Sequence, residues 1–115
     1  MIRMALLVFY PFTVLTLLSC SPTTTDQTSA ATLRGEELYS EHCAECHEQP
    51  HPDLLKQPPN LHGTFGRKTL PSGAPATDKQ VRKTIIEGRG TMPAFDKRLS
   101  NEELDELVQY LHTLK

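Results

Sequence analysis

Hydrophobic residues near the C-terminal end of the chain recur at the three- and four-residue intervals of an amphipathic helix. They are Leu104, Leu107, Val108, Leu111 and Leu114. Ser100 and Glu103 have the spacing of a capping box, and Leu99 could pack on Leu104 as a hydrophobic staple. The pattern therefore predicts a helix that begins just after Ser100.

Two more helices are predicted further upstream. Thr32 could cap a first helix that begins at Leu33, because apolar and aromatic positions recur at helical spacing from there to Cys46. Another helix would begin at Thr77, which forms a second capping box with Gln80, and it would stop at Gly88. No alternating strand pattern occurs, so we predict an all-α fold.

The segment between these helices, residues 48–76, is rich in proline and has no helix or strand periodicity. A structureless loop of this length is uncommon inside a compact domain unless it has a function. A loop wrapped around a large, flat cofactor would account for it.

The N-terminus has the layout of an export signal. One basic residue, Arg3, precedes an almost wholly apolar run from Ala5 to Leu18, which is short for a membrane span. The run ends at Leu-Leu-Ser-Cys, which resembles a bacterial lipobox. We therefore expect a signal peptide over residues 1–19, a lipid on Cys20 and a flexible tether over residues 20–32. The alternative is an uncleaved anchor helix.

Residues 33–115 then form a single small domain. The chain has no tryptophan and a formal net charge of −2, which does not suggest nucleic-acid binding. A domain of this size with little aromatic bulk buries a modest share of its surface. We expect something other than side chains to fill its centre.

The stretch Cys43-Ala44-Glu45-Cys46-His47 carries the candidate chemistry. A thioredoxin-like redox pair uses the same cysteine spacing, but on a βαβ unit that the pattern does not contain. Zinc could use both cysteines and a histidine, with His42 or His51 completing the site. The third interpretation is covalent haem, for which C-x-x-C-H is the attachment signature.

The haem interpretation has a physical reason. Two sulfurs one helical turn apart can each bond a different vinyl group of one porphyrin, and His47 then points its imidazole at the iron. In an exported, all-α chain of this size we favour this reading. It also accounts for all three cysteines, since Cys20 would carry the lipid.

Met92 is the candidate ligand for the other face of the iron. It is the only methionine outside the predicted signal, and it sits in a turn bounded by glycine and proline, a poor place for a core residue. Pro93 favours an extended backbone at Met92. The alternatives are an open sixth position or one of four further histidines, namely His42, His51, His62 and His112.

Together these residues resemble a class I cytochrome c of the mitochondrial type, from about Leu33 to Leu114. The resemblance rests on four motifs in the family's order. They are Gly35 and Tyr39 before the haem motif, the stretch Pro59–Thr69 after it, Met92-Pro93, and Leu107 with Tyr110 near the end.

The resemblance implies roles for several residues. Gly35 would let the terminal helices cross closely against Tyr110. The Pro59 carbonyl would accept a hydrogen bond from the His47 ring, and Arg67 would approach a haem propionate. The chain departs from the family in lacking a tryptophan near the propionates, in a short segment between Arg67 and Met92, and in having Pro58 where the family has glycine.

The implied function is electron transfer by one haem c with His47 and Met92 as axial ligands, and no enzymatic activity. We expect a monomer on the periplasmic side of a bacterial membrane. Its partners would be redox proteins such as a terminal oxidase or a dehydrogenase. Residues 67–98 contain eight basic and three acidic residues, which weakly indicates a docking face for an acidic partner.

Two alternative functions remain open at this point. One is a five-coordinate haem that binds a gas or peroxide, as a sensor or an enzyme. The other is a fixed haem subunit of a larger oxidoreductase complex.

Overall fold

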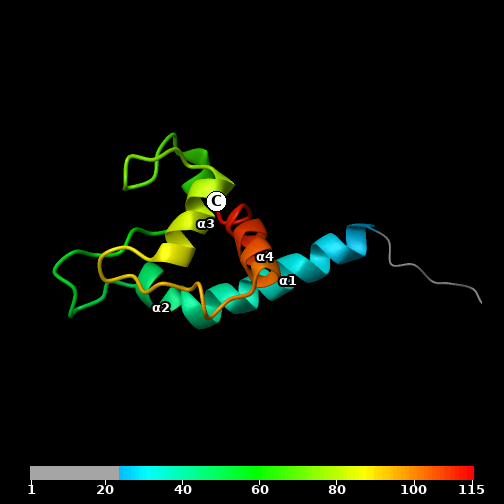
Figure 1. The fold of residues 1–115 in the computed structure, drawn as a ribbon, viewed down its shortest axis with the longest axis horizontal. Helices are drawn as coiled ribbons and strands as arrows, with labels where there is room; N and C mark the ends of the chain where they lie inside the picture. The colour runs from blue at the N-terminus through cyan, green and yellow to red at the C-terminus, as the bar shows by residue number, and fades with distance from the viewer. Residues whose placement is uncertain (1–23) are drawn as a thin grey trace, which may run out of the picture.

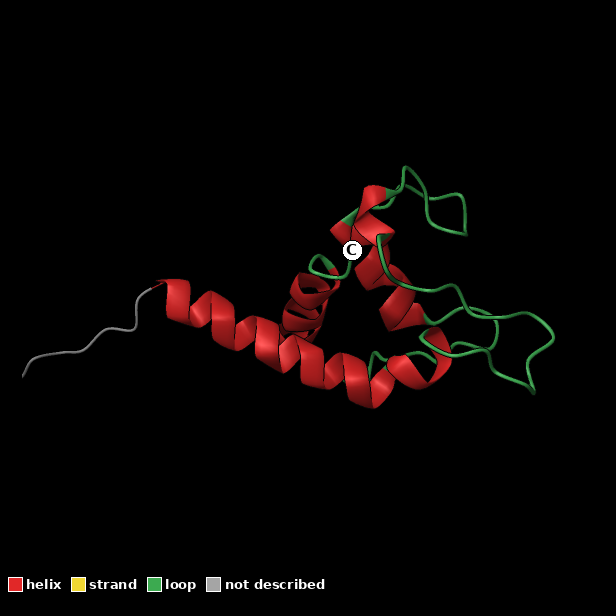
Figure 2. Ribbon diagram, turned by 180° about the vertical axis from the view of Figure 1, so that it is seen from behind, coloured by secondary structure: helices red, strands yellow, loops and turns green. Residues whose placement is uncertain are grey.

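The computed structural model describes residues 24–115 as four α-helices and one 3-10 turn joined by loops (Figure 1). The predicted signal peptide and Cys20 lie outside the described residues. The elements are α1 (Thr24–His42), α2 (Ala44–His47), η1 (Thr64–Gly66), α3 (Asp78–Glu87) and α4 (Asn101–Leu111). Within residues 24–115 there is no strand (Figure 2), so the all-α prediction is confirmed.

The first helix is longer than predicted. α1 begins at Thr24 rather than at Leu33, so residues 24–32 of the predicted flexible tether are helical. The Thr32 hydroxyl does not cap the helix start; it donates to the Thr28 carbonyl one turn earlier, at 2.9 Å. Residues 26–30 are exposed and carry no apolar stripe, so hydrophobic periodicity could not reveal a helix here.

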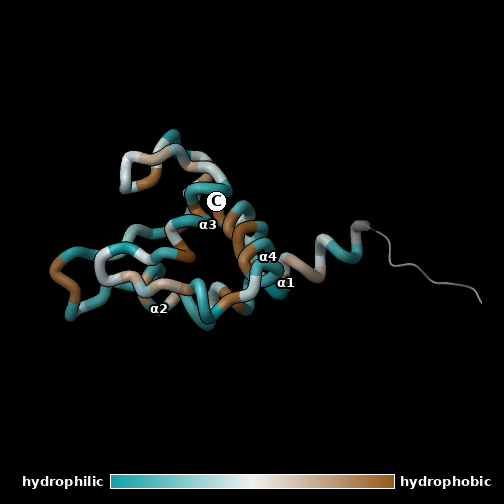
Figure 3. Tube along the Cα trace, in the orientation of Figure 1, coloured by the Kyte–Doolittle hydropathy of each residue, from teal (hydrophilic) through white to brown (hydrophobic). Residues whose placement is uncertain are grey.

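The hydrophobic core forms where α1 packs across α4, and α3 packs against α4 (Figures 1 and 3). Leu38 and Leu107 are its most deeply buried side chains, at 1% and 0% exposure. Tyr39 and Tyr110 bring their rings to 5.4 Å between centroids across the same contact. The other buried members are Val81, Ile85, Phe95, Leu99, Leu104, Val108 and Leu111.

Gly35 sets how closely the two helices approach. A β-carbon at this position would lie 2.2 Å from the Glu106 carbonyl oxygen and 2.7 Å from the Tyr110 β-carbon. Both distances are far below van der Waals contact, and backbone atoms cannot move aside easily. The role that the resemblance implied for Gly35 is therefore confirmed.

The capping box predicted at Ser100 is complete, whereas at Thr77 only the hydroxyl bond forms, because the Thr77 backbone N–H donates to the Pro75 carbonyl. At α4, Ser100 accepts from the Glu103 backbone and the Glu103 carboxylate accepts from the Ser100 backbone, which confirms the capping box. At α3, the Thr77 hydroxyl accepts from the Gln80 backbone N–H, and Gly88 ends the helix with φ of 68°. Both helices therefore start at their capping side chains, and α3 also stops at its glycine.

A search of the described residues for membrane-spanning helices found none: no helix among them combines the length and the apolar character needed to cross a bilayer.

Replacing Gly35 with alanine should lower the free energy of unfolding by about 1–3 kcal/mol, because the added methyl group overpacks the helix crossing. Gly66→Ala is the matched control, since a β-carbon there meets nothing within 4 Å. Urea unfolding of both variants measures the difference. Equal unfolding midpoints for the two variants would contradict the tight crossing.

Candidate functional site

The cysteine pair lies at the junction of two helices. α1 ends at His42, and the short α2 starts again at Ala44, so Cys43 occupies the turn between them. The Cys43 carbonyl accepts hydrogen bonds from the backbone N–H groups of Cys46, at 3.2 Å, and His47, at 3.0 Å. This tight turn brings the two sulfurs and the imidazole to the same wall of one cavity.

The cavity has a volume of about 760 Å³, within the range of cofactor-binding pockets. Its walls come from the end of α1, from α2, from the long loop, from α3 and from the turn after it. Every predicted site residue within the described part of the chain lines it: Cys43, Cys46, His47, Pro59, Arg67 and Met92. Apolar side chains, among them Leu61, Leu70, Val81, Ile85, Phe95 and Leu111, supply much of the remaining wall.

The two thiols are free and partly buried. Cys43 and Cys46 form no disulfide, although they are three residues apart. Burial, with a smaller effect of the neighbouring Cys46, raises the pKa of the Cys43 thiol to about 11. This thiol is therefore protonated at neutral pH, which does not favour a thioredoxin-like nucleophile.

His47 is held in one orientation by a single strong hydrogen bond. Its Nδ1 lies 2.7 Å from the Pro59 carbonyl oxygen. A carbonyl only accepts, so Nδ1 must donate, and Nε2 is left with its lone pair free to bind a metal. The hydrogen bond that the resemblance implied is present, and it is the kind of second partner that a metal-ligating histidine needs.

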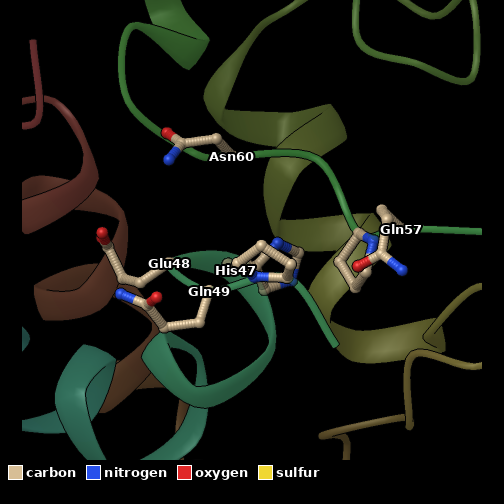
Figure 4. A pocket seen from close by; sticks show the side chains of 7 residues that line it. His47, Glu48, Gln49, Gln57 and Asn60 are labelled. Carbon is tan, nitrogen blue, oxygen red and sulfur yellow. The ribbon is translucent and has the colours of Figure 1, made fainter. Parts of the chain in front are cut away.

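A second, shallower pocket of about 200 Å³ lies beside His47. Figure 4 shows His47 at its centre, with Glu48 and Gln49 on one side, Gln57 on the other and Asn60 above it in this view. Gln57 fastens the loop that forms the far wall, because its amide bonds the backbone N–H and the carbonyl of His51 and the carbonyl of Leu54.

Arg67 lines the cavity and also braces the loop that carries Pro59. Its Nη2 donates to the carbonyl oxygens of Asn60, at 3.2 Å, and of His62, at 3.0 Å. This bracing contact could not be read from the sequence, because it depends on how the loop folds back. The propionate contact that the resemblance implied stays a prediction.

Met92 lies in a tight turn after α3 and lines the same cavity as α2. The backbone groups of Arg89 and Met92 bond each other in both directions, each at 3.0 Å. Gly88 makes this turn possible: a β-carbon on Gly88 would lie 2.6 Å from the Met92 carbonyl oxygen. The Met92 side chain is partly buried and packs against the core.

The other four histidines occupy different places. His42 lines the cavity and meets the Phe95 ring edge-on at 5.9 Å, and His51 also lines it. His62 binds Glu48 outside the cavity lining. His112 pairs with Asp78 at 2.8 Å and stacks on Phe65 at 3.7 Å. His42 and His51 had been considered as alternative ligands, whereas the cavity position of Phe95 was not predicted.

A zinc site would need a cluster of ligands. Across residues 24–115, no group of three or more His, Cys, Asp or Glu side chains is arranged to hold a metal ion.

Comparison with known protein families decides the identity of the fold. Residues 30–111 match the family described as cytochrome c oxidase, cbb3-type, subunit III. The chain belongs to the cytochrome c family. This match covers α1 from residue 30 onwards, the cysteine motif, the Met92 turn and α4.

Several curated cytochromes are similar to this chain. A cytochrome c6-like protein of Nostoc sp. is 28% identical over 80 residues, covering 70% of this chain and 68% of that protein. A cbb3-type cytochrome c oxidase subunit CcoP of Azospirillum brasilense is 35% identical over 105 residues, covering 85% of this chain but only 32% of that subunit. A cytochrome c6 of Gracilaria tenuistipitata var. liui is 28% identical over 82 residues, covering 67% of each chain. No solved structure gives a significant match.

The cavity fits the cofactor of a cytochrome c. It is large and substantially apolar, as a flat macrocycle requires, and its wall carries two thiols and an imidazole with one ring nitrogen free. Met92 lines the same cavity. The donor set matches the cysteine, histidine and methionine chemistry by which proteins hold haem.

Gly88→Ala should destabilise this cytochrome more than Gly90→Ala. Both glycines have positive φ, 68° and 60°, so both substitutions strain the backbone. Only at Gly88 would the methyl group also collide with the Met92–Ala94 backbone, because a β-carbon on Gly90 meets nothing within 4 Å. The expected extra loss is about 1–3 kcal/mol. Urea unfolding of the two variants measures it, and identical midpoints would show that the turn is not packed on Gly88.

Proposed function

We propose that this protein is an electron carrier with one haem c bound covalently through Cys43 and Cys46. His47 and Met92 are the two axial ligands in this proposal. One observation carries it: a single cavity is lined by both thiols, by an imidazole whose Nδ1 is already bonded, and by a methionine in a turn built on glycine.

The chain's own residues have distinct tasks in this proposal. When bound, haem supplies an iron that exchanges one electron, and a methionine ligand raises its reduction potential. Pro59 fixes the His47 ring, so the ligand does not need to reorient between oxidation states. The turn at Gly88 presents Met92, and the apolar walls exclude water from the cavity.

The cellular setting is also part of the proposal. We infer that residues 1–19 direct export, that Cys20 carries the lipid, and that the domain works on the extracytoplasmic side of a bacterial membrane. The motif at Leu17–Cys20 supports this assignment. We expect the protein to act as a monomer without bound nucleic acid.

A second candidate is a haem domain that works within a terminal oxidase complex. The observations that favour it are the match to the cbb3-type subunit III family and the likeness to a CcoP subunit over 85% of this chain. A free carrier would leave the membrane extract as a small protein after mild detergent treatment. An oxidase subunit would migrate with a large complex that consumes oxygen.

The first experiment tests the axial ligands. Residues 20–115 are expressed with a haem-attachment system, and the visible spectrum of the reduced protein is recorded with and without carbon monoxide. The wild-type spectrum should be of the c type and unchanged by carbon monoxide, because Met92 fills the sixth position. Met92→Ala should respond to carbon monoxide.

The other outcomes of this experiment are equally informative. A clear response in the wild-type protein would contradict ligation by Met92 and favour a haem that binds a gas or peroxide. Absence of covalent haem would contradict the whole proposal. His112→Gln is a control, since this residue does not line the cavity and should leave the response unchanged.

Electron transfer to an acidic partner should slow as salt rises, because residues 67–98 carry a strong excess of positive charge. The second-order rate constant with a negatively charged redox protein is measured from low to physiological ionic strength by stopped flow. A rate independent of salt would rule out the basic segment as a docking face.

A further inference from the structure

Glu48, the residue directly after His47, is the centre of a hydrogen-bond network that the proposed function does not use. Its Oε1 accepts a hydrogen bond from the Tyr39 hydroxyl at 2.5 Å. The same oxygen lies 3.0 Å from Nε2 of His62, which comes from the long loop. The network thus joins α1, the end of α2 and the loop at one point.

The partners of His62 fix its charge state. Its Nε2 faces the Glu48 carboxylate, and its Nδ1 lies 3.2 Å from the main-chain oxygen of Lys115. Both partners are acceptors, so both ring nitrogens must donate, and only the protonated imidazolium can do this. The hydrogen bond to Glu48, followed by that to Lys115, accordingly raises the pKa of His62. The Tyr39 hydroxyl and then His62 lower the pKa of Glu48.

His62 is rigidly connected to Pro59, the residue that holds His47. The His62 backbone N–H donates to the Asn60 side chain at 2.8 Å. Arg67 bonds the carbonyls of both Asn60 and His62. Residues 59–62 therefore form one braced unit, and a displacement of His62 is passed on to the Pro59 carbonyl.

These contacts close a ring. His47 binds Pro59 through its side chain, Pro59 leads to His62 through the braced turn, His62 binds Glu48, and Glu48 is covalently joined to His47. We propose that Glu48 and charged His62 form a latch that holds the Pro59 carbonyl against the His47 ring, and that loss of the His62 proton opens it. The inference rests on the proposed role of His47 as a haem ligand and makes His62 a positioning residue.

The direction of the pH dependence follows from the geometry. The groups that contact His62 or its backbone are the Glu48 carboxylate, the Lys115 oxygen, the Asn60 side chain and Arg67, and Tyr39 lies behind Glu48. Because the pKa of His62 is raised in the folded protein, the latch is closed below the ordinary pKa of histidine. It opens as the pH rises through the folded-state pKa, when one of the two ring hydrogen bonds must be lost.

The test follows the His47 ring itself. In the reduced haem-loaded protein, the Nδ1–H proton of His47 is observed by nuclear magnetic resonance. At a fixed pH at which His62 is charged, His62→Gln and Glu48→Gln should make this proton exchange with water about tenfold faster. In the wild type, the chemical shift of the His47 Nδ1–H proton should change with pH as His62 titrates. In His62→Gln this pH-dependent change of chemical shift should be absent.

Two further variants separate positioning from general stability. His112→Gln also removes an exposed histidine that pairs with a carboxylate, at 2.8 Å from Asp78, and it should leave the His47 proton unchanged. Tyr39→Phe keeps the ring packing but removes one bond to Glu48, and it should give a smaller effect of the same sign.

Each result decides the matter. Haem bound in the wild type, with no change of the His47 proton in His62→Gln or Glu48→Gln, would overturn the latch while leaving the proposed function intact. An equal change in His112→Gln would also overturn it. Failure of the wild type to attach haem would instead refute the proposed function, and the latch with it.

Discussion

The close crossing of α1 and α4 at Gly35 is the contact on which the rest of this structure depends. It brings the backbones near enough for Leu38 and Leu107 to be almost completely buried and for Tyr39 to meet Tyr110. The same crossing fixes the direction in which α1 ends, and α1 delivers the cysteine turn. A domain with so small a side-chain core gains much of its definition from this one approach.

The remaining walls of the cavity come from loops that are each braced at a few points. Gln57 fastens the start of the long loop, Arg67 holds its middle, and Gly88 supports the turn that presents Met92. Polar side chains thus bind backbone carbonyls where regular secondary structure is missing. This arrangement leaves the apolar side chains free to face the cavity, which is why a loop without strand or helix periodicity can still form a defined site.

The sequence predicted those features that depend on local chemistry. The capping box at Ser100 and the helix stop at Gly88 both follow from residues a few positions apart, whereas the first helix, predicted to run to Cys46, ends at His42. It could not predict the start of α1, because residues 26–30 are exposed and have no apolar face to give a period. Two other sets of hydrogen bonds could not be predicted either: those from Arg67 to loop carbonyls and the one between His62 and Glu48. They join residues that come together only in the folded protein.

The early start of α1 changes how the domain is presented to its surroundings. Residues 24–32 run away from the crossing as a continuation of the same helix (Figure 1). At about 1.5 Å of rise per residue, these nine residues make a rod of roughly 14 Å. A flexible coil of equal length would limit only how far the domain lies from the start of this segment. A helix also limits how the domain is oriented relative to that point. Whatever holds its far end therefore restricts the directions in which the mouth of the cavity can point.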